Sequence, residues 1–254
     1  NESFECTGFK HVADRDIYCV KRTGHGWLNV QESLMQSCNV CLMDMAAMIG
    51  VDRFTKYQAI FGFGDKTGID LPGEADTSGL VYHADNMGPT ELATSSFGQG
   101  FNCTMVQMAA AYCSVINGGS YYEPHVVKQI LNEQGSVVER KEPVLVRETV
   151  SQSTANFLKQ TMFETVENGT GGAAAVAGYE VGGKTGTAER LPRKDKNYLV
   201  SFAGFAPVED PQVFVYVVID VPNYPPGPQQ AHSSYASAVF SKIMTETLPY
   251  MNIF

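Results

Sequence analysis

The sequence predicts an α+β fold, in which an antiparallel sheet is flanked by helices and joined to a mostly helical subdomain. Helical patterns dominate roughly residues 28–118, whereas strand-like runs and a closing helix occupy roughly residues 120–254. Two successive strand-like runs followed by a helix, after a helical middle, are typical of this class. With 254 residues and 44% hydrophobic content, the chain can bury a full core as one larger domain or two small ones.

The helices of the first part are predicted from their end signals. The first 27 residues are rich in loop formers, with short extended pieces. Asn29 is an N-cap residue with Glu32 at the third position after it, which predicts a helix that runs from there to residues 37–39. The next two helical patterns cover residues 40–49 and 51–61 and are divided by Gly50.

The remaining elements follow in order along the chain. Glycine, aspartate and proline are dense in residues 62–90, which predicts a loop. The later elements are a short segment 91–97, an apolar helix 104–116, strand and turn pieces over 120–150, a helix 151–166, a flexible stretch 171–178, strands over 181–189, 198–205 and 212–221, and a closing helix 233–248.

The overall charge excludes one class of partner. The net charge of −9 and the isoelectric point near 5.0 argue against nucleic acid as a partner, because binding to phosphates needs a basic face. No apolar run approaches the ~20 residues that span a bilayer.

The Gly/Thr-rich stretch over residues 181–189 is the first candidate for a site. We expect it to be the edge strand of an active-site sheet, where its glycines let a substrate backbone approach and pair with the strand. Lys184 supplies a positive charge and Thr185 and Thr187 supply hydroxyls, a set suited to holding a small carboxylate. A glycine-rich hairpin with a solvated lysine is the alternative, and the second copy of the motif, at residues 66–68, is expected to be a loop.

A second candidate lies at the junction of two predicted helices. Ser37 and Asn39 are two residues apart on a turn, so both can face one cleft and hydrogen-bond a peptide or pass a proton. Helix caps use the same residue types, so this pair gains meaning only together with Lys184.

These motifs occur in an order that resembles a known family. Ser-x-Asn, Phe-Gly-Gln-Gly, a Val-x-x-Gly-Thr segment, Gly-Lys-Thr-Gly-Thr-Ala and Phe-Ala-Gly-Phe-Ala-Pro follow one another at residues 37–39, 97–100, 166–170, 183–188 and 202–207. The chain is similar to the transpeptidase domain of class B penicillin-binding proteins of the division and sporulation type. The resemblance implies the fold shared by penicillin-binding proteins and serine β-lactamases, and peptidoglycan D,D-transpeptidase activity.

The resemblance also implies roles for individual residues. Catalytic roles fall to Ser37, Asn39 and Lys184, and substrate-binding roles to Thr185, Gly186 and Thr187. Ser37 would relay a proton to the leaving group, and Asn39 would bond the substrate amide and orient the base. The threonine hydroxyls would bind the terminal carboxylate, and the Thr187 backbone N–H would form half of the oxyanion hole.

One departure from the family is serious, because the chain contains no Ser-x-x-Lys, the motif that carries the nucleophile. We therefore expect residues 1–254 to be the C-terminal portion of a transpeptidase domain whose nucleophile lies on another segment; a natural pseudoenzyme is the alternative. The implied partners are peptidoglycan stem peptides, β-lactams, the missing segment and a cell-wall synthesis complex. The implied location is the extracytoplasmic face of a bacterial membrane, with an N-terminal anchor helix outside this chain. A carboxypeptidase or β-lactamase, or a non-catalytic β-lactam-binding scaffold, are the rival functions.

A cluster of thiols suggests a metal site. The candidate ligands are Cys6, Cys19, His25 and Cys38, the Cys₃His set of a closed structural zinc site. Some relatives of the family carry a ligand-type residue at each of these positions, which favours this set over Cys41 or His11. A Cys6–Cys19 disulfide and unpaired core thiols are the alternatives.

Overall fold

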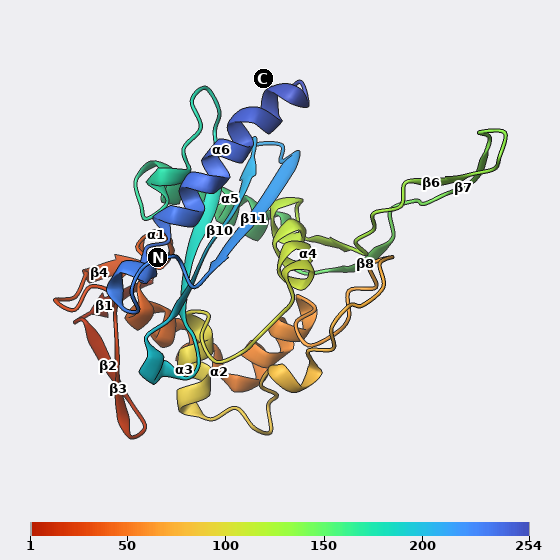
Figure 1. The fold of residues 1–254 in the computed structure, drawn as a ribbon. Helices are drawn as coiled ribbons and strands as arrows, with labels where there is room; N and C mark the ends of the chain where they lie inside the picture. The colour runs from red at the N-terminus through yellow and green to blue at the C-terminus, as the bar shows by residue number, and fades with distance from the viewer. Residues whose placement is uncertain (1, 254) are drawn as a thin grey trace.

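A three-stranded antiparallel sheet forms the centre of the fold. The computed structural model describes residues 2–253, and its sheet contains β9 (Gly182–Glu189), β10 (Tyr198–Ala206) and β11 (Val213–Asp220) in the order β11-β10-β9. Both neighbours pair with β10 antiparallel, as the sequence predicted, and residues 200–206 of this middle strand are buried. Figure 1 shows the sheet at the middle of the molecule with helices on both sides.

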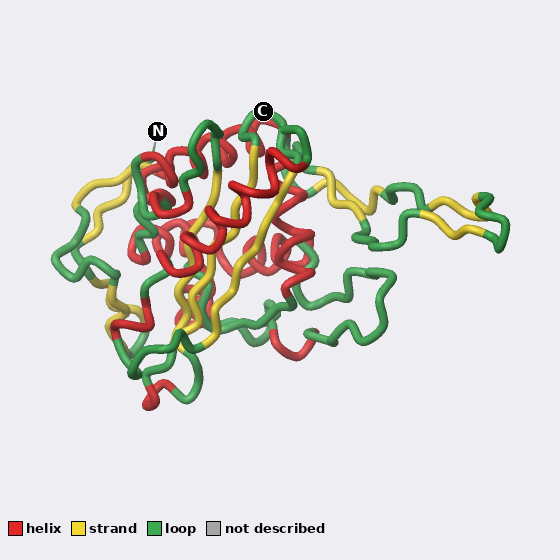
Figure 2. Tube along the Cα trace, turned by 45° about the horizontal axis from the view of Figure 1, so that its top comes forward, coloured by secondary structure: helices red, strands yellow, loops and turns green. Residues whose placement is uncertain are grey.

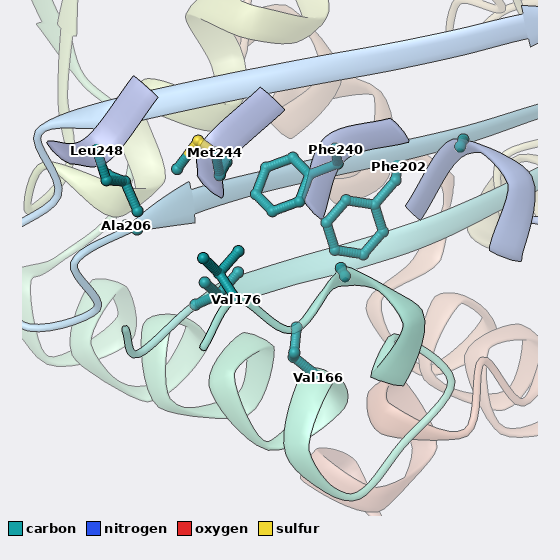
Figure 3. Close-up of a cluster of buried hydrophobic side chains, with 10 residues drawn as sticks. Val166, Val176, Phe202, Ala206, Phe240, Met244 and Leu248 are labelled. Carbon is teal, nitrogen blue, oxygen red and sulfur yellow. The ribbon is translucent and has the colours of Figure 1, made fainter. Parts of the chain in front are cut away.

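Side chains of β10 point alternately into two cores, because successive residues of a strand face opposite sides of the sheet. Phe202 packs against α6 (Ser234–Tyr250), where its ring centroid lies 4.8 Å from that of Phe240 (Figure 3). Phe205 faces the other side, towards α4 (Met105–Ile116) and α5 (Gln152–Glu167). The sheet is therefore a layer between the closing helix and the two middle helices.

The glycines of β9 are required by this packing. A Cβ at Gly183 would lie 2.3 Å from the Phe202 ring, and a Cβ at Gly182 would lie 2.5 Å from the Phe205 ring. These two glycines therefore have a packing role that the sequence did not predict, because aromatic rings of the neighbouring strand fill the space where their side chains would lie. The burial of Phe202 and Phe205 therefore requires glycine at positions 183 and 182.

The helical subdomain begins with two helices joined by a tight turn. α1 (Val30–Met35) has the predicted capping box, in which Asn29 and Glu32 bond each other's backbone. It ends at Met35 rather than at residues 37–39, because Ser37 adopts a left-handed conformation with φ +51°. α2 (Asn39–Ile60) joins the two helices predicted next and is kinked at Gly50, whose φ of +74° interrupts the helical backbone.

A buried glutamine ties the long loop to the helical part. α4 starts with a capping box between Thr104 and Gln107, and the buried Gln107 amide also donates to the backbone of Asp65 and to the Thr77 hydroxyl. The predicted loop over residues 62–90 contains only a short 3₁₀ turn, η1 (Ser78–Leu80), before α3 (Pro89–Ser96). The second Lys-Thr-Gly copy lies in this loop, as predicted, where the Glu74 carboxylate accepts from its backbone.

Small strand pairs surround this core. At the N-terminus β1 (Ser3–Cys6) pairs with β4 (Gly26–Asn29), and β2 (Phe9–Val12) pairs with β3 (Arg15–Tyr18). After α4, β5 (Ser120–Tyr122) pairs with β8 (Leu145–Glu148), and β6 (Gln129–Leu131) pairs with β7 (Val137–Arg140). The β6–β7 hairpin projects from the body of the molecule as an arm (Figures 1 and 2). Short 3₁₀ turns complete the chain: η2 (Gly172–Ala174), η3 (Arg193–Asp195) and η4 (Pro228–Ala231).

Between residues 2 and 253, no helix combines the length and the apolar composition that crossing a membrane requires.

The glycine constraint on β9 predicts the effect of one methyl group. Gly183→Ala is expected to reduce the free energy of unfolding by about 2 kcal/mol or more, because Phe202 must leave its rotamer or the strands must separate. Gly79→Ala is the matched control, since no atom lies within 4 Å of the position of its Cβ and its φ is not positive. Urea unfolding of both variants measures the difference, and equal stability of the two would contradict the packing argument.

Candidate active site

Lys184 and Ser37 meet at the junction of the sheet and the helical subdomain. The Lys184 ammonium donates a hydrogen bond to the Ser37 hydroxyl, although the two residues are 147 positions apart in sequence. Ser37 reaches the sheet because α1 ends just before it, and the left-handed turn is closed by bonds from Ser37 N to Leu34 O (3.1 Å) and from Cys38 N to Ser33 O (2.9 Å). The structure therefore brings together two of the three residues that the sequence predicted as catalytic.

The predicted substrate-binding residues line the free edge of β9. Within the described residues β9 pairs only with β10, so its outer edge can accept another extended backbone, as the sequence predicted. Thr185 is half-buried and Thr187 is exposed, and the two alternate with Gly186 along this edge. Gly186 lies opposite Ser201, whose hydroxyl would be 2.4 Å from a Cβ at that position. The edge therefore offers two hydroxyls beside one ammonium group.

Burial changes the acid–base properties of Lys184. Desolvation lowers the pKa of its ammonium group from the ordinary value of 10.5 to about 8, because removing water penalises the charged form. The ammonium also donates to the Thr185 backbone oxygen (3.2 Å) and to the Thr185 hydroxyl (3.4 Å). A lysine in this range can hold a carboxylate at neutral pH and exchange a proton with Ser37.

Asn39 does not join this network. It is the first residue of α2, and its side-chain amide donates to the Tyr18 backbone oxygen at 3.1 Å. No hydrogen bond links Asn39 to Ser37 or Lys184 within residues 2–253. The start of α2 directs the Asn39 amide towards the end of β3, so a role for it in orienting a base stays a prediction.

Thr170 is a site residue that the predicted set did not include. Its hydroxyl oxygen lies 3.0 Å from that of Thr185. The signal for it was present in the Val-x-x-Gly-Thr segment that ends α5, but that segment gave no indication of which side chain it would reach.

The four predicted metal ligands come together beside Ser37. Their ligand atoms all lie within 4.8 Å of one another; these residues are Cys6, Cys19, His25 and Cys38. Cys6, Cys19 and Cys38 are buried, with at most 2% of their surface exposed. Cys38 directly follows Ser37, so the cluster adjoins the turn that carries the Ser37 hydroxyl.

The loops that form this cluster approach each other through two glycines. A Cβ at Gly8 would lie 2.1 Å from the Arg22 backbone oxygen, and a Cβ at Gly24 would lie 2.3 Å from the Cys6 backbone oxygen. Both glycines also have positive φ values, +99° and +82°. The β1–β2 connection and the segment after β3 can therefore pack tightly enough to place the thiols together.

The spacing of the ligand atoms fits a tetrahedral zinc ion. Zinc–sulfur bonds of about 2.3 Å and zinc–nitrogen bonds of about 2.0 Å would separate two sulfurs by about 3.8 Å and a sulfur from a nitrogen by about 3.5 Å. In the structure, Cys19 Sγ lies 3.8 Å from Cys38 Sγ and 3.6 Å from His25 Nδ1. All six cysteines, which lie within the described residues, are free thiols, so the Cys6–Cys19 disulfide considered from the sequence is not formed here.

The thiols also affect one another's ionisation. The hydrogen bond between the Cys19 and Cys38 thiols lowers the pKa of Cys19, which favours the thiolate form of this sulfur. The same pairing, together with burial, raises the pKa of Cys38. Since thiolates are the form that binds metal, a divalent cation would stabilise charges that are otherwise costly in this buried cluster.

The sequence matches one protein family over almost its full length. The match is to the penicillin binding protein transpeptidase domain and covers residues 1–245. Stage V sporulation protein D of Bacillus subtilis is 35% identical over 256 aligned positions, which cover 99% of this chain and 39% of that protein. Penicillin-binding protein PbpB of Mycolicibacterium smegmatis is 33% identical over 231 positions, covering 86% of this chain and 35% of that protein. The chain thus spans well under half the length of these relatives.

Solved structures show the same fold. Penicillin-binding protein 3 of Mycobacterium tuberculosis, in its apo form, superposes with a TM-score of 0.85 at 26% identity, covering 99% of this chain and 58% of that chain. The same protein in complex with ampicillin gives a TM-score of 0.86 at 26% identity, covering 100% of this chain and 57% of that chain. The predicted α+β transpeptidase fold is therefore confirmed.

The burial of Lys184 predicts an unusual titration. Its side-chain resonances in selectively labelled protein are expected to shift with a midpoint near pH 8, because desolvation favours the neutral amine over the charged ammonium. Below this midpoint the buried charge lowers the free energy of unfolding, and this loss disappears as the pH rises from the lowered pKa towards the ordinary value of 10.5.

NMR spectra recorded between pH 6 and 11 measure this midpoint. The signal should be lost in Lys184→Met and retained in Lys66→Met, which changes the loop copy of the motif. A Lys184 midpoint above pH 10 would show that the side chain is fully hydrated.

Proposed function

The chain belongs to the penicillin-binding protein transpeptidase domain family, and on this premise we propose that it forms the substrate-binding part of a peptidoglycan D,D-transpeptidase. The observation that carries the proposal is the hydrogen bond from Lys184 to Ser37 at the free edge of β9. This contact supports a proton relay through Ser37 beside a strand edge that has no partner in the described residues. The relatives named as D,D-transpeptidases support the assignment of the reaction.

The proposed binding mode follows from the groups along β9. A stem peptide ending in D-Ala-D-Ala adds to the outer edge of the strand through backbone hydrogen bonds. Its terminal carboxylate, or that of a β-lactam, accepts from the Thr185 and Thr187 hydroxyls and is attracted by the Lys184 charge. The Thr187 backbone N–H points to the reacting carbonyl as one donor of an oxyanion hole.

Proton transfer in this proposal runs through Ser37. The hydroxyl gives its proton to the leaving amine and recovers one from Lys184, whose lowered pKa makes the exchange feasible near neutral pH. The attacking serine and its base are not part of this route, because the chain contains no Ser-x-x-Lys. We infer that they are contributed by another polypeptide segment.

Two surfaces fit such a segment. β11 has no partner on its outer side within the described residues, although its residues 213–219 are all apolar or aromatic and only half-buried. Beside it, a cavity of about 570 Å³ lies between α4 and β11 and is lined by apolar side chains that include Ala109, Cys113 and Phe214. An apolar strand edge of this kind is normally covered. A strand and helix that carry the nucleophile would bury both surfaces.

The proposed place of action is outside the cytoplasmic membrane. Peptidoglycan stem peptides are exposed there, and one relative is named a stage V sporulation protein and another a probable peptidoglycan D,D-transpeptidase. A membrane anchor and a cell-wall synthesis complex are parts of this proposal that would lie on other segments or chains.

We further propose that a structural zinc ion is held by Cys6, Cys19, His25 and Cys38. The ligand spacing and the Cys₃His donor set support this proposal. When bound, the ion supplies no reactive group, since four protein ligands leave no open position. Its ligands pin the N-terminal strands and the start of α2, and thereby hold the turn that carries Ser37.

The transpeptidase proposal predicts which polypeptide a fluorescent penicillin labels. The chain alone should give no covalent adduct, because it lacks the nucleophile. Co-expression with a segment that carries Ser-x-x-Lys should give a co-purifying, labelled complex. Lys184→Met in that complex should slow labelling about 100-fold, a loss typical of removing one group that stabilises the transition state, whereas Lys66→Met should label normally.

Three other results would each change the proposal. A covalent adduct on the chain alone would show that it contains its own nucleophile. An assembled complex that is not labelled would indicate a scaffold protein. Rapid turnover of the adduct would indicate a hydrolase of the carboxypeptidase or β-lactamase type.

The zinc proposal predicts a stoichiometry. Metal analysis of purified protein should give about one equivalent of zinc, and Cys38→Ser should remove most of it and lower the Tm by about 5 °C or more. Cys113→Ser is the control, because Cys113 lies outside the cluster and should leave the zinc content unchanged. Protein without bound metal and with a Cys6–Cys19 crosslink in mass spectra would overturn the proposal.

A further inference from the structure

Thr170 lies between the two halves of the candidate site. Its hydroxyl oxygen is 3.0 Å from the Thr185 hydroxyl on β9 and 3.3 Å from the Met35 backbone oxygen at the end of α1. Its backbone N–H also points to Met35 O, at 3.4 Å. Thr170 is therefore in contact both with the carboxylate-binding strand and with the helix end that precedes the Ser37 turn.

The position of Thr170 is set by the glycine before it. A Cβ at Gly169 would lie 2.9 Å from Met35 O and 2.9 Å from Thr165 O, so only glycine lets the end of α5 approach the end of α1 this closely. The chain then turns back through a bond from Gly171 N to Thr165 O at 2.9 Å. The close packing of the end of α5 against the end of α1 thus places the Thr170 hydroxyl beside β9.

The number of hydrogen bonds that the Thr185 hydroxyl can make indicates a role for the Thr170 hydroxyl. A threonine hydroxyl can accept two hydrogen bonds and donate one. The Lys184 ammonium, 3.4 Å away, can only donate to Thr185 Oγ1. If Thr170 also donates to Thr185, both acceptor positions are filled, and the Thr185 proton is left for a ligand.

Thr170 is free to donate in this direction. The Thr170 hydroxyl has two acceptors within reach, Met35 O at 3.3 Å, to which it can donate, and Thr185 Oγ1 at 3.0 Å, where either hydroxyl can be the donor; Thr185 is the nearer, and Met35 O also receives the Thr170 N–H. The opposite arrangement, in which Thr185 donates to Thr170, would turn the Thr185 proton away from an incoming carboxylate. The arrangement of donors around Thr185 therefore decides whether this residue can bind an anion.

We propose that Thr170 is a positioning residue for carboxylate recognition, with its hydroxyl donating to Thr185 so that Thr185 donates to the terminal carboxylate of the ligand. The inference rests on the proposed function, since it concerns the carboxylate end of the same peptide. Thr170 itself is solvent-exposed and acts on the ligand through Thr185.

The test compares a carboxylate with its uncharged amide. Binding of N-acetyl-D-Ala-D-Ala and of its C-terminal amide to the full chain is measured by NMR titration. Thr170→Val keeps the shape of the side chain and removes the hydroxyl, and it should weaken binding of the acid about tenfold, the effect of losing a hydrogen bond to a charged group. Binding of the amide should not change, and Thr170→Ser should bind the acid like the wild type. The control is Thr245→Val, which removes an exposed hydroxyl on α6 and should alter neither ligand.

The possible outcomes separate this inference from the proposed function. If the wild type prefers the acid and Thr170→Val keeps that preference, Thr170 has no positioning role and the proposed function stands. If Thr170→Val weakens acid and amide equally, or if Thr170→Ser fails to restore binding, the residue has only a structural role and the inference is wrong. If the wild type shows no preference for the acid, the carboxylate pocket of the proposed function is itself wrong.

Discussion

The site depends on the contact between Lys184 and Ser37, because it joins the edge of the sheet to a turn of the helical subdomain. Both groups need support from their surroundings. The buried Lys184 ammonium needs a hydrogen-bond acceptor, and the left-handed conformation of Ser37 needs neighbouring residues that hold it in place. Elements far apart in sequence provide that support. Phenylalanines of β10 fix the lateral position of β9, and the end of α5 contacts both α1 and β9.

Tight backbone approaches are the common means by which these elements meet. At Gly183, Gly169 and Gly24 a Cβ would lie within 3.0 Å of a ring or a backbone oxygen. In each place a strand or loop that carries functional groups is brought against a neighbour: β9 against β10, α5 against α1, and the loop after β3 against β1. The positions of the functional side chains are consequently set by residues that have no side chain, and a single methyl group at any of the three would displace them.

The local signals in the sequence predicted much of this structure. Asn29 with Glu32 predicted the start of α1, Gly50 predicted a break where α2 is kinked, and the Gly/Thr-rich stretch predicted an edge strand, since each signal depends on a few neighbouring residues. The early end of α1 was missed because a left-handed conformation at a serine has no clear sequence signal, and the packing role of the β9 glycines was missed because the rings they contact lie more than 15 residues away. Thr170 was missed for the same reason: nothing in its own segment indicates that α5 ends beside α1.

The two edges of the sheet differ in chemistry, and this difference separates their roles. The β9 edge carries glycine, threonine and lysine, so it can stay open to water and still bind a peptide with backbone and hydroxyl groups. The β11 edge carries valine, isoleucine and aromatic residues along its length, and exposing it would leave both apolar surface and unpaired backbone groups in water. The β9 edge is therefore suited to a ligand that binds reversibly, and the β11 edge is suited to a neighbouring strand that stays paired with it. Under the proposed function, the segment that carries the nucleophile would cover β11 and the cavity beside α4, and the peptide would bind to the edge of β9.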